Sequence, residues 1–117
     1  MSDEAFIKPQ IAQLTSAWMI NFIKYDPAPV LEKVKCPVLA LNGSLDLQVP
    51  PKENLSAIKK GLEKGGNKSF ITKELPGLNH LFQECKTGAP NEYASIAQTI
   101  SPVALTEISD WITMQVR

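Results

Sequence analysis

The stretch that decides the fold is CPVLALNG, residues 36–43. Residues 37–42 form a nearly continuous apolar run, which Gly43 closes. A run without polar alternation is typical of a strand that is buried on both faces, as in a parallel sheet. We therefore predict a strand over residues 37–42 and assign the chain to the α/β fold class.

The segments that follow this run continue the pattern. Residues 51–64 carry apolar side chains at helical spacing, and Gly65 and Gly66 predict the end of that helix. The next segment, KSFITKEL, is rich in β-favouring residues and predicts a second strand over residues 69–75. A strand–helix–strand order predicts two parallel strands joined by a crossover helix.

Helical patterns flank this unit on both sides. Residues 10–24 have apolar side chains three and four apart and predict one helix, and Asp26 is a candidate N-cap for a short helix after it. We expect a short helix near residues 92–98 and a last helix over residues 102–114. Two tryptophans, Trp18 and Trp111, fall on apolar helix faces, and we expect both to pack in the core.

Two polar residues follow the two predicted strands. Asp46 lies in the loop GSLDLQVPP after the first strand, and His80, the single histidine of the chain, lies in PGLNHLFQ after the second. The loops after parallel strands open on the same edge of the sheet, where α/β proteins place their sites. We therefore expect Asp46 and His80 to lie close together at the carboxyl edge.

An adjacent Asp and His suggest acid–base chemistry. The carboxylate can accept a hydrogen bond from Nδ1–H of the imidazole and leave Nε2 free as a base for a nucleophile. Spacing alone leaves two simpler interpretations open. An Asp in a turn often bonds only to its own backbone, and a loop histidine often has no partner.

Composition narrows the classes of function. The 117 residues suffice for one domain, and 12 Lys+Arg balance 12 Asp+Glu, which argues against nucleic acid as a partner. No apolar run approaches the ~20 residues of a membrane span. We expect a soluble chain, in the cytoplasm unless an upstream signal peptide is missing. Cys36 and Cys85 fit neither a disulfide framework nor a zinc site, and one histidine excludes a multi-histidine metal site. No cofactor is expected.

The two loops together resemble a known family. CPVLALNGSLDLQVPP is similar to the segment around the triad acid of the α/β-hydrolases, and ELPGLNHLFQ is similar to the segment around their histidine. The resemblance covers about residues 10–117 and is closest to the capped bacterial serine esterases and serine aminopeptidase-like hydrolases. It implies that Asp46 is the triad acid and His80 the triad base. It also implies a small-molecule ester, thioester or amide as the substrate.

The sequence departs from this family at the nucleophile. The family carries its serine in G-x-S-x-G, upstream of the acid, and no serine here has that context. Only Ser2, Ser16 and Ser44 precede Asp46. Ser2 lies at the terminus, Ser16 in a helical pattern and Ser44 in the acid loop itself. Cys85, five residues after His80, is a poor alternative because residues of one loop rarely reach nucleophile–base geometry.

We therefore expect the C-terminal part of a longer hydrolase. Residues 1–117 would form a single partial domain, with residues 1–26 as the end of a helical cap region and 27–117 as core. The isolated chain is expected to be inactive and to form homo-oligomers through an exposed strand edge. The alternative is a non-enzymatic α/β interaction module that binds a partner through the same edge.

Overall fold

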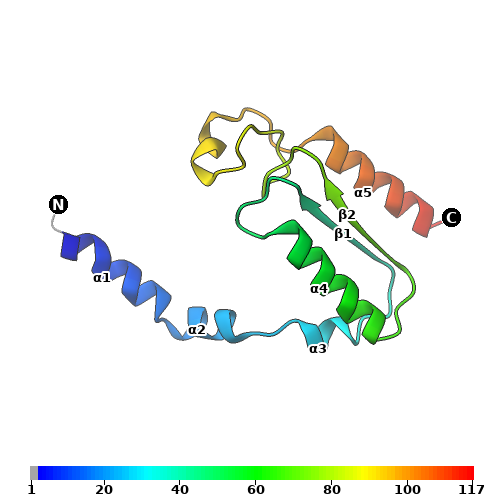
Figure 1. The fold of residues 1–117 in the computed structure, drawn as a ribbon, viewed down its shortest axis with the longest axis horizontal. Coiled ribbons are helices and arrows are strands. Elements are labelled where there is room, and N and C mark those ends of the chain that lie inside the picture. The colour runs from blue at the N-terminus through cyan, green and yellow to red at the C-terminus, as the bar shows by residue number, and fades with distance from the viewer. Residues whose placement is uncertain (1–2) are drawn as a thin grey trace.

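The computed structural model describes residues 3–117 of the chain. At its centre lies a two-stranded parallel sheet of β1, Val38–Gly43, and β2, Phe70–Leu75. The crossover helix α4, Pro51–Lys64, lies on one side of the sheet, and the last helix α5, Pro102–Gln115, lies on the other (Figure 1). The chain is therefore mixed α/β, as predicted.

The predicted pairing of the two strands is confirmed. The register runs in parallel from Val38 opposite Phe70 to Gly43 opposite Leu75. Both strands begin one residue later than predicted. The helix predicted over residues 51–64 has those bounds, and Gly65 caps its end.

Apolar contacts lie on each side of the sheet. On the side of α4, Leu62 is fully buried. On the side of α5, Ala104 packs with Leu75 and Leu78, and Leu41 and Phe82 lie against this cluster. Leu78, in the loop that carries His80, is therefore part of the core. Its contact with Leu75 fixes the position of that loop relative to the end of β2.

Strand β1 is less buried than its apolar sequence predicts. Val38, Leu39 and Leu41 are only half-buried, because among residues 3–117 β1 has a neighbouring strand on one edge alone. An open groove of about 530 Å³ lies beside it, and Trp111 of α5 lines that groove together with Leu39. The expectation that Trp111 is a core residue is therefore wrong, since the ring borders an open groove and is half-buried.

The single helix predicted over residues 10–24 is also wrong. The structure has two helices instead, α1, Asp3–Leu14, and α2, Ala17–Lys24. The break falls at Thr15 and Ser16. The hydroxyl of Thr15 donates to Ile11 O, and the Ser16 side chain accepts from Met19 N as the N-cap of α2. Serine and threonine side chains compete for backbone groups in this way and interrupt helices.

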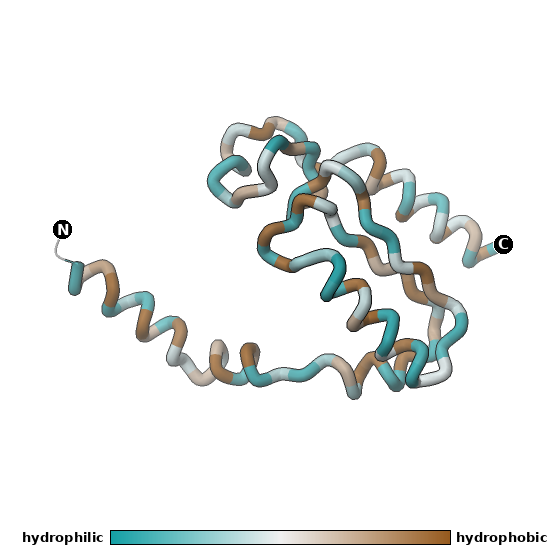
Figure 2. Tube along the Cα trace, viewed as in Figure 1, coloured by the Kyte–Doolittle hydropathy of each residue, from teal (hydrophilic) through white to brown (hydrophobic). Residues whose placement is uncertain are grey.

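The α1–α2 segment extends away from the rest of the chain (Figure 1). Figure 2 shows hydrophobic positions along it, yet neither helix has a buried residue. Trp18 is 68% exposed and stacks on Phe22, so the expectation that Trp18 packs in the core is wrong. The radius of gyration is 17.7 Å, against about 13 Å for a compact domain of this length.

The remaining elements are short. Helix α3, Ala28–Leu31, has Pro27 at its N-cap position, one residue later than the predicted cap Asp26. The Asp26 carboxylate still accepts from Ala28 N at 3.0 Å. The short helix predicted near residues 92–98 is a 3-10 turn, η1, at Pro90–Ser95. The Ser101 hydroxyl accepts from Val103 N and caps α5 as predicted.

Candidate functional site

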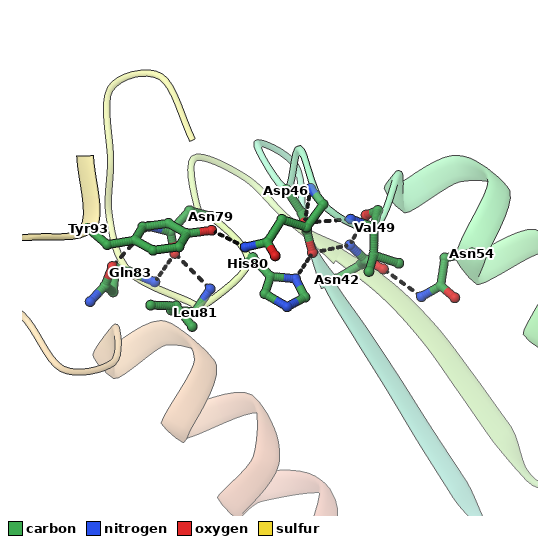
Figure 3. A network of polar contacts seen from close by, with 10 residues as sticks. Asn42, Asp46, Val49, Asn54, Asn79, His80, Leu81, Gln83 and Tyr93 are labelled. Carbon is green, nitrogen blue, oxygen red and sulfur yellow. Dashed lines mark hydrogen bonds and ion pairs between the residues drawn. The ribbon is translucent and has the colours of Figure 1, made fainter. Parts of the chain in front are cut away.

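The structure brings Asp46 and His80 together at the carboxyl edge of the sheet. Asp46 Oδ2 lies 2.9 Å from His80 Nδ1, although the residues are 34 positions apart (Figure 3). Asp46 comes from the loop after β1, and His80 from the loop after β2. The predicted proximity is confirmed, and of the two simpler interpretations, a histidine without a partner is excluded.

The two loops are held against each other by backbone contacts. Leu45 N donates to Leu78 O at 3.0 Å, and Ser44 N donates to Leu75 O at 2.9 Å. The approach is so close that a Cβ on Gly43 would lie 2.2 Å from Leu78 O. A glycine is therefore required where β1 ends, because any side chain would push the histidine loop away from Asp46.

The Asp46 carboxylate is saturated with hydrogen-bond donors. Oδ1 accepts from Gln48 N at 2.9 Å and from Val49 N at 2.8 Å. Oδ2 accepts from Asn42 Nδ2 at 3.3 Å, besides its contact with His80. An ionised carboxylate has about four acceptor sites, and all of them are used here. Asp46 thus makes the turn bonds of the simpler interpretation and binds His80 as well.

These contacts set the charge of Asp46. Its side chain is 6% exposed, and burial by itself would raise the pKa. Hydrogen bonds from Val49 N–H, His80 and Gln48 N–H outweigh burial and hold the pKa below its ordinary value. Asp46 is therefore a carboxylate at neutral pH. A negative charge beside Nδ1 favours the imidazole tautomer that carries its proton on Nδ1.

The histidine loop has its own buried anchor. Asn79 is fully buried, and its Oδ1 accepts from Leu81 N at 2.9 Å and from Gln83 N at 3.0 Å. Phe82 has a positive φ of 56°, and its carbonyl accepts from Ser101 N. A tightly bonded turn with one left-handed residue fixes the backbone on both sides of His80.

The free side of the imidazole faces outward. The His80 side chain is 36% exposed, and within residues 3–117 Nε2 has no hydrogen-bond partner. In Figure 3 this nitrogen points away from Asp46. An imidazole held on Nδ1 by a carboxylate and open on Nε2 can take a proton from a hydroxyl or thiol and return it.

Several residues that support the pair were not predicted from sequence. Asn42 is buried at the end of β1, and its Oδ1 accepts from Asn54 Nδ2 at 2.7 Å. Gln48 Nε2 donates to Tyr93 Oη at 2.6 Å and connects the acid loop to η1. The available signal was the asparagine in an otherwise apolar strand, since a polar residue at a buried position requires partners.

The serines and cysteines near the pair do not supply a nucleophile. Ser44 Oγ accepts from Gly77 N at 2.8 Å, and within the described part of the chain no serine, threonine or cysteine hydrogen-bonds His80. Cys85 Sγ lies 3.6 Å from Gly77 O. Burial, and then the charge of Glu92, raise the pKa of the Cys85 thiol, which disfavours the reactive thiolate.

Two further classes of site are absent from residues 3–117. No group of three or more His, Cys, Asp or Glu side chains is placed to hold a metal ion. No helix there combines the length and the apolar character needed to cross a membrane.

Comparison with models of protein families, with curated proteins and with solved structures gives no match.

Proposed function

We propose that this chain supplies the acid and the base of a serine hydrolase of the α/β-hydrolase type. The observation that carries the proposal is the 2.9 Å contact between Asp46 Oδ2 and His80 Nδ1, with Nε2 unengaged. The order strand, Asp loop, helix, strand, His loop supports it, as does the resemblance of both loops to that family. The substrate class is a carboxylic ester, thioester or amide.

In the proposed reaction, His80 moves the proton. A serine hydroxyl attacks the acyl carbon, and His80 Nε2 takes the hydroxyl proton as the C–O bond forms. The same proton passes to the leaving alcohol, thiol or amine as its bond to the acyl carbon breaks. Water then attacks the acyl-enzyme by the same route and releases the acid. Asp46 keeps the Nδ1–H tautomer and stabilises the imidazolium.

The nucleophile would come from polypeptide upstream of Asp46, in a G-x-S-x-G turn. The chain of 117 residues is then expected to have no hydrolase activity above background, because loss of the nucleophile removes most of the rate. A burst of product from an activated ester that disappears in His80→Ala would contradict this part of the proposal.

The test is a protein that includes the polypeptide encoded upstream of Met1. We expect it to hydrolyse p-nitrophenyl esters, with kcat reduced about 10⁴- to 10⁶-fold by His80→Ala and by a similar order for Asp46→Asn. Asp110→Asn, a change of an exposed carboxylate on α5, is the matched control and should leave the rate unchanged. Equal rates in wild type and His80→Ala would refute the proposal.

A second candidate is a non-enzymatic module that binds a partner strand. The observation that favours it is the free edge of β1, together with the open apolar groove beside it. The two candidates differ at the loops, since an interaction module has no need for the Asp46–His80 pair. Unchanged partner binding in His80→Ala, together with an upstream stop codon, would favour the module.

A further inference from the structure

The Asp46–His80 contact is part of a longer chain of hydrogen bonds. Asn54, the fourth residue of α4, donates from Nδ2 to Asn42 Oδ1 at 2.7 Å. Asn42 Nδ2 in turn donates to Asp46 Oδ2 at 3.3 Å and to Val49 O at 3.1 Å. The chain of contacts therefore runs from α4 through β1 to the Asp46 carboxylate (Figure 3).

The amide of Asn42 is placed where a hydrophobic residue would be expected. Asn42 is 4% exposed. The four residues of β1 that precede it, 38–41, are all apolar. A buried amide is costly unless its polar atoms are bonded, and here both ends are bonded. Its two N–H groups reach the same loop at two points, the carboxylate of Asp46 and the carbonyl of Val49.

Asn42 contacts the same carboxylate oxygen as His80. Oδ1 of Asp46 is fixed by two backbone N–H groups, whereas the Asn42 amide is, among residues 3–117, the only donor on Oδ2 besides His80. Without that donor, rotation of the carboxylate about its last bond would be limited only by its backbone contacts. Asn42 therefore adds a side-chain restraint on Oδ2, the oxygen that faces His80 Nδ1, to the two backbone bonds that hold Oδ1.

We propose that Asn42 is a positioning residue that aims the Asp46 carboxylate at His80, and that Asn54 holds Asn42 in place. The inference rests on the proposed function for its catalytic meaning. Its structural content, the control of His80 by Asn42, is testable in the 117-residue chain without any activity.

The single histidine makes the test simple. In protein with ¹⁵N-labelled histidine, at a pH where the imidazole is neutral, NMR gives the ratio of Nδ1–H to Nε2–H tautomers at His80 alone. Wild type should be mainly Nδ1–H. Asn42→Leu, which keeps the number of side-chain heavy atoms but removes the donor, should lower this ratio about three- to tenfold, as for the loss of one ordinary hydrogen bond. Asn54→Ala should lower it by a smaller factor.

The matched control is Asn67→Ala. Asn67 is also a buried asparagine that donates to two carbonyls, those of Val34 and Cys36, but it lies at the opposite end of the sheet. Asn67→Ala should leave the tautomer ratio of His80 unchanged. A wild-type ratio in folded Asn42→Leu would overturn the inference. Should Asn42→Leu fail to fold, the tautomer ratio of His80 in Asn54→Ala is the test. A wild-type ratio in Asn54→Ala would then overturn the inference.

The outcome separates the inference from the proposed function. A lowered ratio in Asn42→Leu supports the positioning role even where the upstream polypeptide carries no serine nucleophile. In a protein that does hydrolyse esters, Asn42→Leu should lower kcat with little change in KM, because the substrate does not touch Asn42. An unchanged kcat there would overturn the inference while leaving the roles of Asp46 and His80 intact.

Discussion

At the scale of the residue, the site depends on a carboxylate with no free acceptor position. Four donors converge on Asp46, two from its own turn and two from side chains of other segments. A proton on this carboxylate would displace one of the donors. The ionised form is thereby favoured, and the imidazole of His80 is held by a fixed negative charge.

This arrangement predicts an acid-dependent stability. Because the pKa of Asp46 is lowered in the folded state, its contribution to the free energy of unfolding is present above its ordinary value of 3.8 and is lost as the pH falls through the folded-state value. Asp46→Asn should lower the free energy of unfolding by about 1–3 kcal/mol at neutral pH and flatten its decline in acid.

Urea unfolding between about pH 2.5 and pH 7 would measure this, across the ordinary range of carboxyl pKa values. Asp110→Asn, on the exposed face of α5, is the control and should keep the wild-type dependence on pH. A parallel decline of stability in wild type and Asp46→Asn would contradict the role assigned to the Asp46 charge.

A second prediction concerns Gly43. Gly43→Ala would place a Cβ 2.2 Å from Leu78 O and 2.6 Å from Asn79 O, so the histidine loop must move. We expect a loss of about 1–3 kcal/mol in the free energy of unfolding, and a weaker Asp46–His80 contact seen as a lower Nδ1–H population by NMR. Gly66→Ala, strained at φ 79° but with open space around it, should lose stability without altering His80.

The sequence predicted Asp46 and His80 but not the residues that hold them. Both follow strands whose apolar runs are visible in the sequence, so their shared edge could be inferred from topology. Asn42 and Asn79 are buried, and their partners depend on loop conformations that no local pattern encodes. The positive φ of Phe82 is a case of tertiary contacts overriding residue preference.

At the scale of the element, α4 is the structural support of the site. It packs on the sheet through Leu62 and contacts α3. Its residue Asn54 donates a hydrogen bond to Asn42, which in turn donates to Asp46. Its bounds were predicted from sequence because helical periodicity and a glycine stop agree. The α1–α2 break was missed, because the competition of Thr15 and Ser16 for backbone groups leaves the apolar periodicity intact.

Helix α4 has buried residues and helix α1 has none, so substitutions in the two helices should differ in their effect on stability. Leu62→Ala in α4 should lower the free energy of unfolding by about 2–5 kcal/mol, since it empties a fully buried position. Leu14→Ala in α1, where the side chain is exposed, should change it by less than about 0.5 kcal/mol. Chemical denaturation of both variants measures the difference. Equal losses would show that α1 packs against the core after all.

At the scale of the whole molecule, one edge of β1 has no neighbouring strand among residues 3–117. Val38 N and Ser44 N donate to backbone oxygens on the β2 side. Because backbone groups alternate along a strand, those of Leu39 and Leu41 face the free edge. Exposed strand edges pair with other chains. We propose that the isolated chain forms dimers or larger oligomers through this edge.

Leu39→Pro tests the proposed assembly. Proline removes the Leu39 N–H from the free edge while leaving the bonds between β1 and β2. Light scattering at tens of micromolar protein should show oligomers for wild type and a shift toward monomer for Leu39→Pro. A monodisperse wild-type monomer at that concentration would contradict association through β1.

The central claim, that Asp46 and His80 serve a serine outside this chain, is tested most directly by covalent labelling. A fluorophosphonate reacts preferentially with a serine that a base has activated. In the protein extended by its upstream polypeptide, mass spectrometry should find one labelled serine in G-x-S-x-G, with labelling abolished by His80→Ala, and no label on the 117-residue chain. A serine labelled at the wild-type rate in His80→Ala, or no labelled serine at all, would contradict the account.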